Sequence, residues 1–297
     1  LYKMMISSIV SVSSERSFKN KLLSFSNCRT ITKKNTTTKT TTVRKSSSRS
    51  LIINNFSSSS ATNINASKES IERAKESGLV LAVFNKDEVL KVREELKSKN
   101  TEELATVDDS IIDWFVRDRK LDEEQALKKI LKYQNWRDGN FSIEALNAQS
   151  VVEEAKTGKA VLMDERDILG RPVVLVTLIK HDVGTRVLED TQKLCVKLLD
   201  EGLAELKAEG FEQETVMCVY DLRGFSMKNA DIDFTKFFIS CIFDYYPKRI
   251  SQVLLVDAPF VFKPVWAIIK PLMGKYSSLV KFVKAKEANE FFTSDPF

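Results

Sequence analysis

The chain has 297 residues, one histidine, four cysteines and a formal charge of +5. A single imidazole excludes zinc sites built on several histidines, and any Ser-His-Asp or Cys-His arrangement would have to include His181. The nucleotide-binding patterns GxGxxG and GxxxxGKS/T are both missing, so the composition argues against most hydrolases and nucleotide-dependent enzymes.

The positive charge is unevenly distributed along the chain. Residues 1–67 contain eleven Lys or Arg and one acid, a charge of +10, whereas residues 68–297 contain 35 bases and 40 acids, a charge of −5. The sequence pI near 8.8 averages these two parts and describes neither of them. It is therefore no evidence that the globular part binds nucleic acid, and we expect no nucleic-acid partner.

Residues 1–67 are predicted to be disordered. They hold 26 Ser or Thr and bury too little apolar surface to offset the entropy of ordering. A Ser-rich, basic and acid-poor segment is typical of an organellar transit peptide, and this density of hydroxyl groups favours the chloroplast. The alternative is a basic arm that contacts RNA or membrane. No apolar run of 18 residues occurs, so we expect no membrane span.

Short helices are predicted next, over a region that we place at 68–145. Val89, Val92 and Leu96 recur at helical spacing, and Asp108 can cap a helix that carries Ile111, Ile112, Phe115 and Val116. A further amphipathic segment runs from Asp122 to Trp136.

From residue 160 strands and helices are predicted to alternate. A hairpin turns at 167–172, and strands are expected at 216–220, 253–256 and 279–283. Between them lie helices at 191–207, from Asp231 onward, and from Pro264 to about Pro271. This order predicts an α/β domain at 146–297, with a mostly parallel sheet and right-handed crossovers.

Two isolated features of this region have plain interpretations. Cys195, Cys218 and Cys241 lie far apart and read as small buried apolar side chains in a reducing compartment. His181 follows a strand beside Asp182, which we interpret as a polar pair at a strand end rather than as a proton shuttle.

Five short motifs follow one another along the chain at 111–122 (IIDWFVRDRKLD), 167–173 (DILGRPV), 221–224 (DLRG), 246–249 (YPKR) and 256–259 (VDAP). In sequence and order they resemble the motifs of one family, the CRAL-TRIO proteins, which includes the yeast phosphatidylinositol transfer protein. Phe262, Trp266 and the segment 270–272 follow the last of them, and the resemblance covers roughly 105–290.

The resemblance implies a non-enzymatic lipid carrier whose only ligand is a bound lipid and which needs no metal or other cofactor. In the implied CRAL-TRIO fold, a mostly parallel mixed sheet floors an apolar pocket, a gate helix closes it, and a small helical subdomain precedes it. Twelve of the eighteen phenylalanines lie after position 210 and supply apolar area. We expect the pocket to be lined by Tyr220, Phe225, Phe238, Tyr246 and Phe262.

The gate helix is predicted to lie against an anionic membrane surface. Its candidate residues combine apolar bulk with two lysines: Lys263, Trp266, Ile269, Lys270 and Met273. The lysines are seven residues apart and so share a helix face, which suits a helix lying in the membrane interface. The alternative is a buried crossover helix.

The family's headgroup site is only partly retained. Its basic pair matches Arg119 and Lys120, and its threonine falls on Ser277, but its glutamate is replaced by Lys248. The family's lysine falls on Val280, and Lys281 is shifted to the opposite face of a strand. Because Lys248 exchanges an acceptor for three donors, we favour phosphatidic acid or a phosphoinositide phosphate over phosphatidylinositol.

These features predict a plant, plastid-imported phospholipid carrier in the stroma, peripherally bound to envelope or thylakoid membranes. Two other functions stay open. One is a carrier of an isoprenoid such as a carotenoid or tocopherol. The other is an adaptor that reads membrane lipid to place a partner protein.

Overall fold

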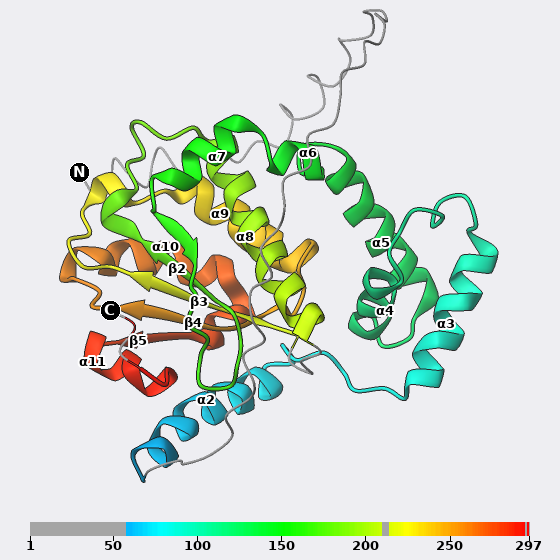
Figure 1. The fold of residues 1–297 in the computed structure, drawn as a ribbon, viewed down its shortest axis with the longest axis horizontal. Coiled ribbons are helices and arrows are strands. Elements are labelled where there is room, and N and C mark those ends of the chain that lie inside the picture. Colours follow the sequence, from blue (N-terminus) through cyan, green and yellow to red (C-terminus); the bar gives the residue numbers. More distant parts are fainter. Residues whose placement is uncertain (1–57, 210–213, 295, 297) are drawn as a thin grey trace, which may run out of the picture. The chain divides into compact units, whose positions relative to one another are not determined.

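A five-stranded mixed sheet organises the chain, and its strands lie side by side in chain order (Figure 1). The computed structural model describes residues 58–209, 214–294 and 296. Strand β1 (Ala160–Leu162) pairs antiparallel with β2 (Val173–Thr177), and β3 (Val216–Asp221), β4 (Ile250–Val256) and β5 (Val280–Val283) follow as parallel neighbours. The predicted hairpin and mostly parallel sheet are confirmed.

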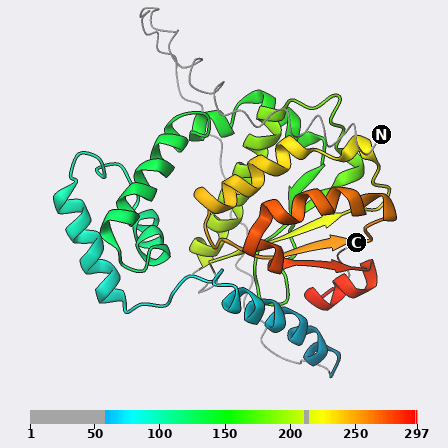
Figure 2. The same cartoon turned by 180° about the vertical axis from the view of Figure 1, so that it is seen from behind.

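One helix connects each pair of successive parallel strands. These helices are α8 (Leu188–Glu209), α9 (Ile232–Asp244) and α10 (Lys263–Met273). Because the strands follow chain order, crossovers of one hand place all three helices on the same face. The opposite face is covered by α2 (Ser58–Glu76) and by the C-terminal segment with α11 (Ala285–Ala288), as Figures 1 and 2 show.

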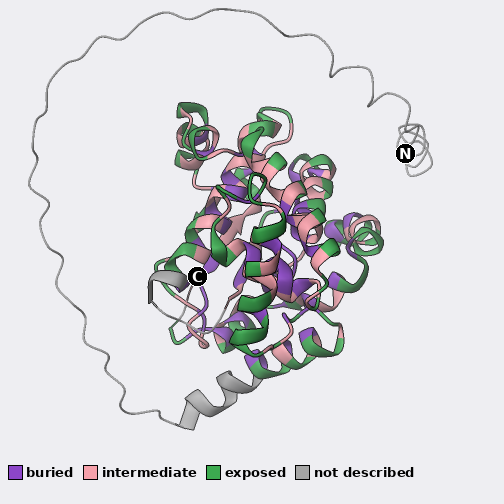
Figure 3. Ribbon diagram, turned by 90° about the vertical axis from the view of Figure 1, so that its right-hand side faces the viewer, coloured by how far each residue is buried: buried purple, intermediate pink, exposed green. Residues whose placement is uncertain are grey.

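Strand alternation separates two apolar layers. Along β3, Cys218 and Tyr220 face the crossover helices, whereas Met217 and Val219 face α2 and the C-terminal segment. The layer under α2 is packed with Phe291 and Phe292, both almost fully buried. Figure 3 shows buried residues along the strands and on the inward sides of the surrounding helices.

The predicted helices before residue 140 are confirmed, and short helices continue to the sheet. They are α3 (Lys86–Lys99), α4 (Asp109–Asp118), α5 (Glu123–Asp138), α6 (Ile143–Leu146) and α7 (Gln149–Lys156). Asp108 caps α4 by accepting from the Ser110 N–H at 2.8 Å, and Asp122 caps α5 by accepting from the Gln125 N–H at 3.0 Å.

Helices α4 and α5 pack on the segment between α9 and β4. The Trp114 indole N–H donates to the Pro247 carbonyl at 3.1 Å. Trp136 stacks on Tyr245, with ring centroids 4.1 Å apart and planes 7° apart. The helical region is thus attached through aromatic contacts directly before β4.

Helix α2 begins inside the segment that we assigned to the disordered tail. It spans Ser58–Glu76, and its residues Ala66, Ser67 and Ser70 are buried. The folded part therefore starts before residue 68. Because these side chains are small, the helix can pack closely on the second face of the sheet. Residues 1–57 of the predicted tail lie outside the described residues. In the described part of the chain, no helix has the length and apolar composition of a membrane span.

Candidate functional site

An apolar cavity lies between the sheet and the crossover helices α8, α9 and α10. Its volume is about 160 Å³, and its wall includes side chains from β2, β3, β4 and β5 as well as from all three helices. Engineered apolar cavities of about 150 Å³ hold a molecule the size of benzene. In this conformation the cavity is therefore too small for a diacyl lipid, which must displace part of the wall to enter.

Four of the five predicted pocket residues line this cavity: Tyr220, Phe225, Phe238 and Phe262. The prediction for Tyr246 is wrong. Its hydroxyl donates to Asp200 at 2.5 Å, and its ring packs beside Trp114, Tyr133 and Trp136 in the contact with the helical region. Its motif neighbour Lys248 has a backbone φ of +63°, which marks a sharp turn of the chain directly before β4.

The predicted gate helix, α10, forms one wall of the cavity. Trp266, Ile269 and Met273 line it, whereas Lys263 and Lys270 are exposed. The helix therefore presents an apolar face to the cavity and both lysines away from it, so the alternative of a fully buried crossover helix does not hold for its lysine-bearing face.

The segment that contains α10 is bounded by two unusual backbone conformations. Asp257, directly after β4, has a φ of +48°, and Gly274, directly after α10, has a φ of +51°. Ahead of the helix, Phe260 is 79% exposed, with the Lys263 ammonium 4.6 Å from its ring centre. A large exposed aromatic ring beside a cation is the arrangement expected of a membrane-contacting surface.

The predicted headgroup residues Arg119 and Lys248 meet at a buried carboxylate that the sequence analysis did not single out. Asp118, whose side chain is 3% exposed, pairs with Arg119 Nη2 at 2.8 Å and with Lys248 Nζ at 3.1 Å. Two cations share one carboxylate, so this cluster carries a formal charge of +1. Lys120 lies on the adjacent turn and is exposed.

The cluster is connected to the end of α10 but does not line the cavity. The Lys248 N–H donates to the Tyr276 hydroxyl at 3.2 Å, and Tyr276 follows α10 by three residues. Ser277 donates to the Gly274 carbonyl at 2.8 Å, which keeps its hydroxyl at the helix end. Met273 and Val280, which flank this segment, both line the cavity. The cluster thus lies beside the end of the cavity nearest the start of β5.

The register of β5 confirms the expected difference between Val280 and Lys281. Val280 pairs with Val253 and lines the cavity. Lys281 pairs with Leu254 and points to the other layer, where its ammonium lies 5.3 Å from the Phe291 ring centre. Lys281 therefore cannot replace the missing cation on the cavity face.

The other end of the cavity is polar, and its central pair was missed. His181 does not pair with its neighbour Asp182: its Nε2 lies 3.1 Å from Asp231 Oδ2, with Arg186 Nη2 3.0 Å from Asp231 Oδ1. Asp231 also accepts from the Phe234 N–H at 2.9 Å and so caps α9 as predicted. The partners are 50 residues apart, and only the parallel pairing of β2 with β3 brings them together.

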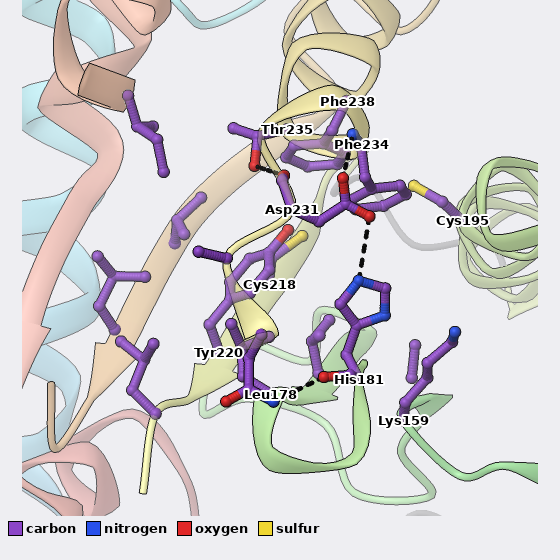
Figure 4. Close-up of a pocket in the computed structure, with 18 of the residues that line it drawn as sticks. Lys159, Leu178, His181, Cys195, Cys218, Tyr220, Asp231, Phe234, Thr235 and Phe238 are labelled. Atoms are coloured by element: carbon purple, nitrogen blue, oxygen red, sulfur yellow. Dashed lines mark hydrogen bonds and ion pairs between the residues drawn. The ribbon is translucent and has the colours of Figure 1, made fainter. Parts of the chain in front are cut away.

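A second ion pair lies at the same end. Lys159, directly before β1, pairs with Glu154 and donates to the Thr191 hydroxyl at 3.3 Å. Lys159, His181, Thr191 and Asp231 all line the cavity, and all are buried. Figure 4 shows His181 and Asp231 facing each other beside Phe234.

Cys218 and Cys241 are buried among apolar residues, as predicted, and Cys195 is partly buried. Cys195 and Cys218 line the cavity, Cys241 is buried in the adjacent core, and none forms a disulfide. Burial raises the pKa of the Cys218 thiol to about 12, so it stays protonated at neutral pH. Among the described residues, no group of three His, Cys, Asp or Glu is placed to hold a metal ion.

The fold and cavity define a class of protein: an α/β domain whose sheet floors an apolar cavity closed by a helix. Residues 156–294 match the family model described as "CRAL/TRIO domain". A CRAL-TRIO domain-containing protein of Schizosaccharomyces pombe is 30% identical over 185 residues, which span 59% of this chain and 41% of that protein. "Phosphatidylinositol transfer protein CSR1" of Eremothecium gossypii is 26% identical over 200 residues, 63% of this chain and 45% of that protein.

A solved structure shares the fold. The crystal structure of Sfh5 superposes with a TM-score of 0.52 at 16% identity, covering 71% of this chain and 85% of that one. Residues 156–294 are therefore similar in sequence to CRAL-TRIO domains, and the chain shares its fold with Sfh5. The matched region spans less than half the length of the two relatives named above.

The charge of Asp231 should stabilise the polar end of the cavity in a pH-dependent way. Burial alone would raise the pKa of Asp231, but hydrogen bonds from His181, Arg186 and the Phe234 N–H outweigh it and lower that pKa below its ordinary value. The stabilisation is then complete above the unfolded-state pKa, near 4, and is lost as the pH falls below it.

We expect Asp231→Asn, which can still cap α9, to lower the free energy of unfolding by about 1–3 kcal/mol at pH 7. Urea denaturation should show this difference shrinking between about pH 4 and pH 2. Asp233→Asn, at an exposed position in the same helical turn, serves as the control. A difference that stays constant or grows as the pH falls would show that the charge of Asp231 contributes nothing.

Proposed function

We propose that this protein binds a phospholipid with a phosphate headgroup, phosphatidic acid or a phosphoinositide phosphate, and transfers it between membranes without chemical change. The acyl chains occupy the cavity under α10, and the phosphate lies at the Asp118–Arg119–Lys248 cluster. The observation that carries this proposal is the excess of cations around one buried carboxylate beside the cavity end.

The surroundings of the cluster add to its positive charge. Glu214 pairs with both Arg117, at 2.7 Å, and Arg249, at 3.7 Å, so this second group also carries a formal charge of +1. Together with exposed Lys120, these residues carry a formal charge of +3. Such a surface suits a phosphate, which accepts hydrogen bonds only, better than an inositol ring, which also needs acceptors for its hydroxyl groups.

Lipid entry requires α10 to move, because the cavity is much smaller than a diacyl lipid. We propose that α10 and the preceding Phe260 contact an anionic membrane, and that the cavity opens there. Lys263, Lys270 and the exposed ring of Phe260 favour this docking. The globular part carries a net negative charge, so its attraction to an anionic surface has to come from such local features.

We further propose that the carrier works in the chloroplast of a plant, on envelope or thylakoid membranes. The composition of residues 1–67, with 26 hydroxyl side chains and one acid, supports this location.

The role of Lys248 is tested by Lys248→Gln. The substitution removes one donor from the cluster, and we expect the transfer rate of phosphatidic acid between vesicles to fall about five- to tenfold. Lys275→Gln removes the same charge from an exposed position just past α10 and should leave the rate within about twofold. Equal losses in the two variants would mean that Lys248 acts only through net charge and that the headgroup site is wrong.

Membrane docking is tested by Phe260→Asp. Inserting a phenylalanine ring into the interface contributes about 1.5–3 kcal/mol, so the affinity for vesicles that contain phosphatidic acid should fall at least tenfold. Val83→Asp changes a residue that is 93% exposed and lies between α2 and α3, and it should have no effect. Vesicle flotation measures the membrane affinity of both variants. Undiminished flotation of Phe260→Asp would exclude this surface as the membrane contact.

A further inference from the structure

The cavity has a second polar end, opposite the cluster at Lys248. Lys248 precedes β4, whereas His181 follows β2 and Asp231 follows β3. The two groups therefore lie at opposite ends of the parallel strands. The polar side chains that line this end are Lys159, His181, Thr191, Asn229, Asp231 and Thr235.

The formal charges at this end cancel. Lys159 is paired with Glu154, and Asp231 is paired with Arg186. A phosphate or carboxylate would have to compete with one of these buried carboxylates for its cation and leave a charge unpaired, which is costly away from water. The end opposite Lys248 therefore suits an uncharged polar group.

Nearly all of the hydrogen-bonding groups here are already engaged. The Asn229 amide donates to the His181 carbonyl at 2.6 Å and accepts from the Ser226 N–H at 2.7 Å. The Thr235 hydroxyl donates to the Asp231 carbonyl at 2.7 Å, and the Thr191 hydroxyl donates to Glu154. A ligand therefore finds few open partners at this end.

One ring nitrogen of His181 is open. Asp231 is acceptor-only, so Nε2 carries the proton and donates to it, which leaves Nδ1 of the neutral ring as an acceptor. Among the described residues, Nδ1 has no hydrogen-bond partner, although His181 is only 7% exposed and lines the cavity. Figure 4 shows this second nitrogen turned away from Asp231, toward the side on which Lys159 is drawn.

We propose that this end of the cavity binds the hydroxyl group of a neutral lipid, which donates a hydrogen bond to Nδ1 of His181. Esters, ethers and ketones have no proton to donate and leave Nδ1 unpaired. The inference rests on the proposed function only in taking the cavity to be a lipid site, since the hydroxyl and the phosphate occupy opposite ends. The ligand class is a long-chain or isoprenoid alcohol.

A single-chain probe displaces less of the cavity wall than a diacyl lipid does, so hexadecan-1-ol is compared with its methyl ether, which has the same chain but no donor. Competition with a fluorescent fatty-acyl probe gives both affinities. One net hydrogen bond should make the intact protein bind the alcohol about five- to tenfold more tightly than the ether.

In His181→Gln the alcohol-to-ether ratio should fall to about one, because the amide NH₂ can still donate to Asp231 whereas its acceptor, Oε1, sits beside that NH₂ and not at the position of Nδ1. The ratio is insensitive to a general loss of folding, which would weaken the binding of both ligands. Tyr220→Phe is the comparison variant: its hydroxyl also lines the cavity. A ratio lost in Tyr220→Phe but kept in His181→Gln would overturn the assignment to His181.

His181 is the only histidine, so ¹⁵N-histidine labelling of the untagged chain gives one pair of ring signals. The unprotonated Nδ1 resonance should move on addition of hexadecan-1-ol and stay in place with the ether. Equal affinity for alcohol and ether, with no movement of Nδ1, would overturn the proposal while leaving the cavity a lipid site. Failure of both probes to bind, together with no transfer of phosphatidic acid by the same protein, would instead contradict the proposed function.

Discussion

The two faces of the sheet are covered in different ways, and the rest of the structure depends on this asymmetry. Under α2, the side chains of alternate strand residues pack against Phe291 and Phe292 and fill the space. On the other face, three crossover helices cover the strands without filling the space between helices and sheet. An apolar cavity is therefore left between Tyr220 and Trp266. Apolar walls without polar partners do not hold ordered water, which leaves a site for the chain of a lipid.

Polar groups occur at both ends of this cavity, and their charge balance differs. At the end of the sheet where β4 and β5 begin, Arg119 and Lys248 share the single carboxylate of Asp118, which leaves one positive charge for an anion. At the opposite end, where β2 and β3 finish, Asp231 and Lys159 each have a counter-ion. An ionic headgroup and a neutral hydroxyl group are thus expected at opposite ends of one apolar space, of which α10 forms one wall.

Much of the fold and part of the site could be predicted from the sequence, because both depend on local patterns. Strand alternation separated Val280 from Lys281, and helix spacing put Lys263 and Lys270 on one face. The resemblance to the CRAL-TRIO family placed Tyr220 among the pocket residues. Interactions between distant segments were not predictable in this way. His181 pairs with Asp231 rather than Asp182, and Lys248 with Asp118, because strand pairing and the packing of α4 decide these contacts. Tyr246 was misplaced for the same reason: its partners come from α5 and α8.

The central claim is that this cavity carries lipid. Its most direct test is mass spectrometry of an organic extract of the full chain, purified without detergent from cells that express it, beside an unrelated protein purified in the same way. The account predicts a phospholipid with a phosphate headgroup, at about one molecule per protein when every cavity is filled. An extract that contains no more lipid than the control, from protein that is folded by circular dichroism, would contradict the account.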